Sequence, residues 1–367
     1  MKNQSNLTSI QLMLFIIQTQ IGVGVLGLPF NVFSVSKGDA WISVLLAGIV
    51  VQSFITIFWV LGRRFPSKSL FQYSIQLVGK AGGTFINVSY VFYGLLVTSL
   101  ILMYSTAIIK TWVLTLTPKW IIMLLLMGTA IYLGKELLSD ICNVYVVVSG
   151  LIFFLIMISI VVLFMYPVDW RYLLPIGHSG GVNILKGVKE AYFSMLGFEL
   201  LLFLFPYFQH NGVRSVLFSA TMANLFVTLM YAFLTIVSLI TFSPEELVII
   251  PQPVLYYVKS LYLQIVERVD LVFVSLWVVS VITSLTSYLF LSTEGSTHIF
   301  KRIKRPVITI FFGSLSFIIA LVPNKASQMD MYNKWVLNIS YLFVLVIPFI
   351  LLGVSFIFKK KERGKRV

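Results

Sequence analysis

Two glycine-containing segments have the composition to form a binding site inside a helical protein. The first reads 22-GVGVLGLP-29, and its three glycines and one proline destabilise a continuous helix by several kcal/mol in sum. Where a helix unwinds, the half-helix that follows presents free N–H groups and a partial positive charge, which suit a carboxylate. Glycine also lets a ligand approach the backbone closely. Gly22 and Gly24 are therefore predicted to bind ligand, and the alternatives are close helix packing through small residues or a simple proline kink.

The second segment reads 197-GFELLLFLFP-206 and combines Gly197, Glu199 and Pro206. Carbonyl groups freed near Gly197 could accept from an ammonium or hydroxyl group. Glu199 is expected to be the only ionisable residue well inside a predicted membrane-spanning helix, where its charge is costly to desolvate. It could pair with a ligand ammonium, relay a proton or line an ion path. Alternatively, it is a protonated carboxyl group that hydrogen-bonds across helices.

Hydroxyl groups lie at regular spacings in two further segments. Ser280, Ser284 and Ser287 share one helical face, with Thr283 beside it. Asn87, Tyr90 and Tyr93 recur every three residues in another segment. These segments offer polar groups to the bundle interior, and Tyr93 is predicted to face a ligand cavity. Hydrogen bonding between helices explains the hydroxyl groups equally well, and packing or an interfacial aromatic belt would explain the tyrosines.

Other kinds of chemistry find little support in the sequence. The single Cys142 excludes an intramolecular disulfide, and the three histidines match no metal-ligand spacing. Nucleotide-binding loops and nucleophile elbows are absent. We therefore expect no metal, no cofactor and no enzymatic activity, and we expect no nucleic-acid partner.

The elements that must position these residues are transmembrane helices. Of 367 residues, 59% are hydrophobic and only 11% charged, whereas soluble domains carry roughly 25% charged residues. The apolar runs are continuous rather than alternating, which indicates helices and not barrel strands. About 20 apolar residues cross a bilayer. The predicted spans are 9–34, 40–61, 84–109, 119–134, 143–165, 188–207, 215–241, 270–293, 305–322 and 335–358.

The basic residues predict the orientation of these ten helices. With both termini in the cytoplasm, 17 of the 27 Lys and Arg residues fall on the cytoplasmic side. The chain is then one transmembrane domain, 1–367, built from repeats at about 9–165 and 188–358 and a basic tail, 359–367. Five helices per repeat give the halves opposite orientations. The first and sixth helices occupy equivalent positions, and a pair of interrupted helices at such positions points to a binding site between them.

The segment Gln20–Pro29, the Gly-Phe-Glu…Pro stretch, the ten-helix length and the short basic tail carry a resemblance. The chain resembles the amino acid–polyamine–cation transporter superfamily and, more narrowly, the spore-germination permeases, the B subunits of nutrient germinant receptors. The resemblance implies a leucine-transporter-like fold with broken helices 1 and 6. It implies an amino-acid-like nutrient near the midplane, with Val23 and Phe198 beside the residues named above. It also implies A-type and C-type partner subunits in the spore inner membrane. In transporters of this fold, hydroxyls at the position of Thr283 and Ser284 bind sodium or line the substrate site.

Three functions are compatible with these features. The first is a ligand-sensing receptor subunit on a permease scaffold. The second is an autonomous secondary amino-acid transporter, although the fifth span lacks the lysine that serves proton coupling in some amino-acid permeases. The third is a channel-like or scaffolding membrane subunit without a ligand. Net uptake into vesicles and co-purification with partner subunits distinguish them.

Overall fold

The computed structural model describes residues 7–261 and 267–362 and contains helices but no strand within these ranges. Four short 3-10 turns and one π-helical turn, η5 (Leu342–Val346), connect or extend the helices. The fifteen α-helices are α1 (Ser9–Gln20), α2 (Gly24–Ser36), α3 (Ala40–Arg64), α4 (Leu70–Trp112), α5 (Lys119–Gly134), α6 (Leu138–Met165), α7 (Gly181–Ser194), α8 (Leu201–Phe208), α9 (Val213–Thr241), α10 (Pro244–Leu247), α11 (Pro253–Lys259), α12 (Val269–Ile299), α13 (Arg305–Leu321), α14 (Ala326–Tyr341) and α15 (Ile347–Ile357).

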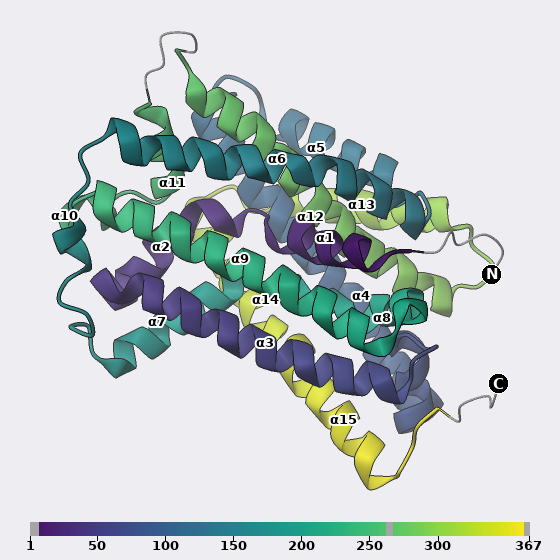
Figure 1. Ribbon diagram of the computed structural model, residues 1–367. Coiled ribbons are helices and arrows are strands. Elements are labelled where there is room, and N and C mark those ends of the chain that lie inside the picture. Colours follow the sequence, from purple (N-terminus) through teal and green to yellow (C-terminus); the bar gives the residue numbers. More distant parts are fainter. Residues whose placement is uncertain (1–6, 262–266, 363–367) are drawn as a thin grey trace.

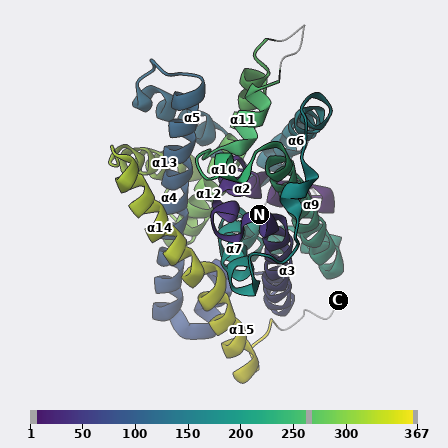
Figure 2. The same cartoon turned by 90° about the vertical axis from the view of Figure 1, so that its left-hand side faces the viewer.

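The long helices run in roughly one direction, and the two labelled ends of the chain lie at the same end of the bundle (Figure 1). Figure 2 shows α2 and α12 in the middle, with α4, α5 and α14 on one side and α3, α6 and α9 on the other. The interruption between α1 and α2 therefore lies inside the bundle rather than on its surface.

Length and hydropathy identify six helical segments, within the described ranges, that are long and apolar enough to cross a membrane. A seventh is added if α7 and the helical segment Phe198–Asn211, bent by 58° at their break, count as one span. Helices α5 and α13 are apolar but shorter. The prediction of an all-helical integral membrane protein is confirmed, whereas the count of ten spans stays a prediction. Helix α4 begins earlier than the predicted span 84–109, and it consists of two helical pieces that meet at a kink, because Gly79 has a non-helical backbone conformation with φ +85°.

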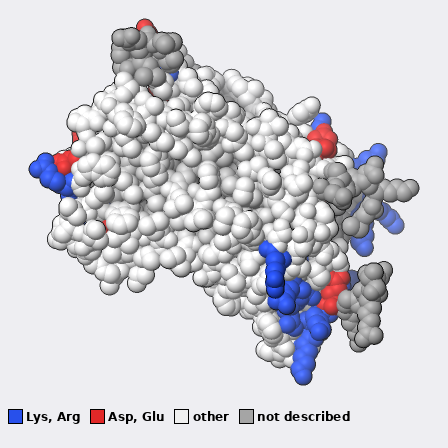
Figure 3. Space-filling model, in the orientation of Figure 1, with Lys and Arg blue, Asp and Glu red and all other residues white. Residues whose placement is uncertain are grey.

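Charge is distributed as a membrane protein requires. On the face shown in Figure 3, the middle of the molecule carries almost no charged side chains. Lys and Arg side chains gather at the end where Figure 1 places the termini. An uncharged belt between charged ends matches the apolar thickness of a bilayer.

Small residues allow the central helices to pack closely. A Cβ atom at Gly94 of α4 would lie 3.1 Å from the Tyr288 carbonyl oxygen of α12. One at Gly295 of α12 would lie 2.7 Å from the ring of Phe71 on α4. Because lipid offers no hydrophobic driving force for association, such close contact is a main source of stability between membrane helices.

Candidate functional site

The two interrupted helices contact each other at their breaks. Helix α1 ends at Gln20 and α2 begins at Gly24, while α7 ends at Ser194 and the 3-10 turn η3 begins at Phe198. Gly197 has φ +129°, a conformation that L side chains rarely adopt. A Cβ atom there would lie 3.0 Å from the Gln20 nitrogen. Glycine is thus required both by the backbone angle and by the approach of the α1 backbone.

Side chains within the protein already satisfy most carbonyl groups at these breaks. The Tyr231 hydroxyl lies 2.8 Å from the Gln20 carbonyl oxygen and 3.3 Å from that of Ser194. The Gln20 amide donates to the Met195 carbonyl at 2.7 Å, and the Trp277 indole donates to the Gly22 carbonyl at 3.1 Å. The carbonyls expected to accept from a ligand ammonium near Gly197 are therefore largely occupied.

A cavity of about 410 Å³ begins at the breaks and extends to the loop before α11. This volume suits a small organic ligand. Its wall is contributed by the α1–α2 and α7 breaks, α4, α12, α14 and the loop before α11. The polar wall residues are Thr19, Gln20, Asn31, Tyr104, Glu190, Ser194, Gln252, Ser284, Tyr288, Asp330 and Asn333.

Four of the predicted site residues line this cavity: Gly22, Val23, Gly24 and Ser284. The missing side chains of the two glycines, however, point at neighbouring helices. A Cβ atom at Gly22 would lie 2.8 Å from the Ser284 hydroxyl oxygen, and one at Gly24 would lie 3.1 Å from the Ser194 Cα atom. The glycines thus allow close helix contact while their backbone stays at the cavity wall.

The other predicted residues lie behind the wall. Tyr93, Gly197, Phe198, Glu199 and Thr283 are all buried and do not line the cavity. Glu199 is fully buried and accepts three hydrogen bonds, from the Tyr288 hydroxyl at 2.6 Å, the Tyr93 hydroxyl at 3.0 Å and the Gly197 N–H at 2.7 Å. Because Tyr288 does line the cavity, Glu199 connects a wall residue to the α7 break.

The α12 hydroxyls bind the end of α1 directly. The Ser284 hydroxyl lies 3.0 Å from the Thr19 carbonyl oxygen and 3.1 Å from that of Gln18. The Thr283 hydroxyl contacts the Gln18 side-chain oxygen at 2.9 Å. These contacts are hydrogen bonds between helices, one of the two roles considered from the sequence.

Two acidic side chains at the outer part of the cavity were not singled out from the sequence. Glu190 lies on α7 one turn before its break, and Asp330 lies on α14 and accepts from the Tyr104 hydroxyl at 3.2 Å. Glu190 lies at the edge of the predicted span 188–207, and Asp330 lies outside the predicted spans. For Glu190 the available signal was an acidic residue seven positions before the predicted break at Gly197, and for Asp330 there was none.

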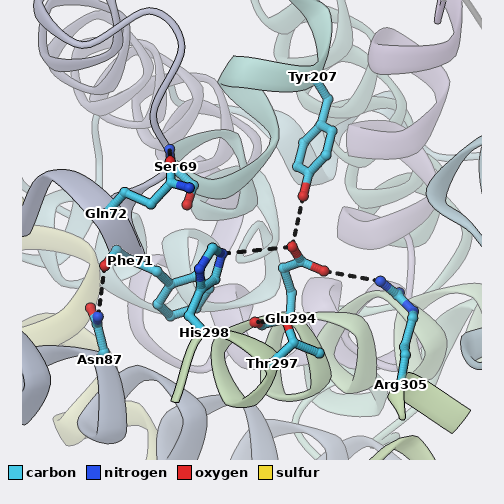
Figure 4. A network of polar contacts seen from close by, with 9 residues as sticks. All are labelled: Ser69, Phe71, Gln72, Asn87, Tyr207, Glu294, Thr297, His298 and Arg305. Atoms are coloured by element: carbon cyan, nitrogen blue, oxygen red, sulfur yellow. Dashed lines mark hydrogen bonds and ion pairs between the residues drawn. The ribbon is translucent and has the colours of Figure 1, made fainter. Parts of the chain in front are cut away.

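A second polar cluster lies away from the cavity (Figure 4). The Glu294 carboxylate accepts from the Tyr207 hydroxyl at 2.7 Å and pairs with Arg305 at 2.9 Å, and His298 Nε2 lies 3.8 Å away. The cluster joins α8, α12 and the first residue of α13. Glu294 was not singled out from the sequence, and the expectation for Glu199 stays a prediction. The predicted span ended at residue 293, whereas α12 continues to Ile299.

The arrangement of helices is similar to that of one solved membrane-protein structure. The chain matches the structure of a Na⁺-coupled sialic acid symporter with a TM-score of 0.65 and 11% sequence identity. The match covers 95% of this chain and 78% of the symporter. A likeness at this identity establishes the fold and leaves the solute open.

Sequence comparison then identifies the family. Residues 6–329 match the family described as spore germination protein, so the chain belongs to the spore germination permeases. It is 28% identical to spore germination protein GerQB of Bacillus cereus over 90% of each chain. It is 24% identical to spore germination protein YndE of Bacillus subtilis over 99% of each chain. The family resemblance inferred from the Gln20–Pro29 segment is confirmed.

Proposed function

We propose that this chain is the membrane subunit of a spore nutrient germinant receptor that binds an amino acid in the 410 Å³ cavity. The observation that carries the proposal is the position of that cavity, at the meeting point of two helix breaks in a germination permease. Gly22, Val23, Gly24 and Ser284 contribute to the wall. The first-turn N–H groups of α2 have no partner inside their own helix, and they offer a carboxylate site.

The finer architecture belongs to the same proposal. We take α1–α2 and α7–η3–α8 as broken helices 1 and 6 of ten spans in a leucine-transporter-like 5 + 5 inverted repeat. The basic end then faces the cytoplasm of the spore interior, and the cavity opens outward through the spore inner membrane. The A-type and C-type receptor subunits are its proposed partners. Glu199, with Tyr93, Gly197, Phe198 and Thr283 around it, supports the cavity from behind.

A cavity-filling substitution tests the proposal. Asn333 of α14 lines the cavity, whereas Asn338 of the same helix is exposed and does not. In spores that carry this chain with its A and C partners as their sole nutrient receptor, Asn333→Trp should raise the effective amino-acid concentration at least about tenfold, since ~1.4 kcal/mol of lost binding corresponds to that factor. Asn338→Trp should behave like the parent. Equal responses from both variants at equal protein levels would contradict the location of the site.

The alternative is an autonomous secondary amino-acid transporter, which the fold shared with a Na⁺-coupled symporter favours. Uptake of radiolabelled amino acids into proteoliposomes that contain only this chain separates the two. A receptor subunit should bind amino acid without net accumulation, with or without a sodium gradient. Accumulation that needs no A or C subunit would establish the transporter.

A further inference from the structure

We infer that the ligand of this cavity is an α-amino acid whose side chain carries a positive charge. This inference rests on the proposed function, because it names the substrate class of the same site. It combines an unpaired acceptor at the inner end of the cavity with two carboxylates at its outer part.

The inner end holds one buried acceptor without a partner. Gln20 is only 2% exposed and lines the cavity. Its amide nitrogen donates to the Met195 carbonyl, which can only accept, so the orientation of the side chain is fixed. The Gln20 Oε1 atom is buried and has no hydrogen-bond partner among the residues that the structure describes. Leaving a buried acceptor unpaired is costly, and an ammonium group would satisfy it.

The same end can hold a carboxylate. The α2 N-terminus begins at Gly24, four residues after Gln20, and its first N–H groups have no partner within the helix. An acceptor and a set of donors that lie within four residues in the sequence and at the wall of one cavity match the ammonium and carboxylate groups on one α-carbon. The ammonium and carboxylate groups of an amino acid are therefore expected to bind at the breaks, with the amino-acid side chain directed toward the outer part of the cavity.

The outer part of the cavity carries negatively charged side chains. Glu190 and Asp330 line the cavity, its wall contains no Lys, Arg or His, and neither carboxylate forms an ion pair among the residues that the structure covers. The adjacent Lys189 and Lys334 are exposed and do not line the cavity. Two carboxylates without an ion-pair contact, in a cleft with partly apolar walls, concentrate a negative potential that attracts a cation.

The spacing between the two ends fits an extended basic side chain. Glu190 precedes Ser194, at the break, by four residues of helix, which corresponds to about 6 Å. Asp330 lies seven residues from Leu337 of the inner wall, or about 10 Å along α14. The five bonds from Cα to the terminal nitrogen of lysine span about 6 Å. A lysine side chain thus matches the distance along α7 to Glu190 from a head group bound near Gln20, whereas Asp330 lies farther out and acts on the ammonium group through its charge.

Binding to the purified full-length chain in lipid nanodiscs tests this inference, with calorimetric titration of L-lysine, L-norleucine and L-alanine. Norleucine has the length of lysine without its charge. Lysine should bind at least about tenfold more tightly than norleucine, as expected for a charge paired with two carboxylates in a partly buried site. Glu190→Gln and Asp330→Asn should each weaken lysine binding severalfold and leave norleucine binding unchanged. Glu245→Gln, an exposed α10 substitution outside the cavity, is the matched control.

Three outcomes would overturn the inference in distinguishable ways. Equal binding of lysine and norleucine would remove the charge preference while the proposed amino-acid site stands. A lysine preference that survives both substitutions would place its cause elsewhere. No binding of any amino acid, with correctly folded protein, would overturn the proposed function together with this inference.

Discussion

The carboxylate of Glu199 offers the sharpest test of how the site is held together. It receives two hydroxyl groups on Oε1 and one backbone N–H on Oε2. In Glu199→Gln, either orientation of the amide leaves at least one of these donors without an acceptor. The expected loss is about 1–3 kcal/mol of unfolding free energy. Glu199→Leu removes all three acceptors at similar volume.

Glu199→Leu should lower the unfolding free energy more than Glu199→Gln does, but by less than three times the cost of one unpaired donor. The Tyr93 and Tyr288 rings are in edge-to-face contact, with centroids 6.3 Å apart, so their hydroxyls can approach each other when the carboxylate is gone. A loss of about 3–6 kcal/mol follows. Unfolding by SDS in mixed micelles, monitored by circular dichroism, measures both variants. Glu136→Gln, an exposed substitution, should stay within about 0.5 kcal/mol of the parent.

A double-mutant cycle separates support of the cavity wall from direct contact with ligand. If Glu199 acts by fixing Tyr288, then Glu199→Gln and Tyr288→Phe should shift the nutrient dose–response similarly, and the double variant should add little. Fully additive shifts, or an unfolding free energy for Glu199→Leu equal to that of the parent, would refute this reasoning.

The other predictions concern the breaks, the second polar cluster and the topology. Gly197→Ala should lower the unfolding free energy by about 2–5 kcal/mol, because the alanine is strained at positive φ and contacts the α1 backbone. Gly212→Ala is the control: with φ +97° and open space around it, it should show only the smaller loss that comes from backbone strain. Gly22→Leu and Gly24→Leu should abolish the nutrient response while the protein still inserts, because each leucine side chain displaces a serine at the cavity wall. Normal nutrient sensitivity in both variants would argue against a role of these glycines in the site. Glu294→Ala should lower the unfolding free energy by about 3 kcal/mol, since Arg305 loses its carboxylate partner in a mostly buried setting. Glu294→Gln should lower it less, and an unchanged SDS midpoint for both variants would argue against a stabilising role of the cluster. Reporter fusions at residue 367 and in the 166–186 loop should give opposite signals, and equal signals would eliminate the ten-span topology.

Much of the fold was accessible from the sequence because membrane helices depend on local composition. Continuous apolar runs fixed the helical class, and the glycine–proline segment indicated where α1 gives way to α2. Boundaries were less accessible. Helix α12 continues past residue 293, where the Glu294 carboxylate contacts Tyr207 of α8 and Arg305 of α13. Hydropathy registers Glu294 only as a charged residue and cannot anticipate these partners.

The site could be predicted from the sequence only in part, because hydrogen bonds within the protein decide which polar groups remain available to a ligand. Gly22, Gly24 and Ser284 do reach the cavity wall, yet the sequence could not show that Tyr231 and Trp277 satisfy the carbonyls of the breaks. It could not show that Gln20 retains an unpaired oxygen or that Asp330, distant in sequence, faces the same space as Glu190. These facts depend on contacts between helices that no local pattern encodes. The roles of the individual site residues, and the inverted repeat, stay predictions.

The π-helical turn η5 fixes the rotation of α14 about its own axis. A π turn contains one residue more than an α turn over the same rise, and the Tyr90 hydroxyl binds the Phe343 carbonyl within it at 2.7 Å. Deleting one residue of Leu342–Val346 would restore α-helical register and rotate α14 by about 100° relative to α15. Asp330 and Asn333 would then leave the cavity, which cysteine labelling at position 333 would detect. The number of residues in this segment, more than their identity, thus determines which side chains of α14 face the cavity.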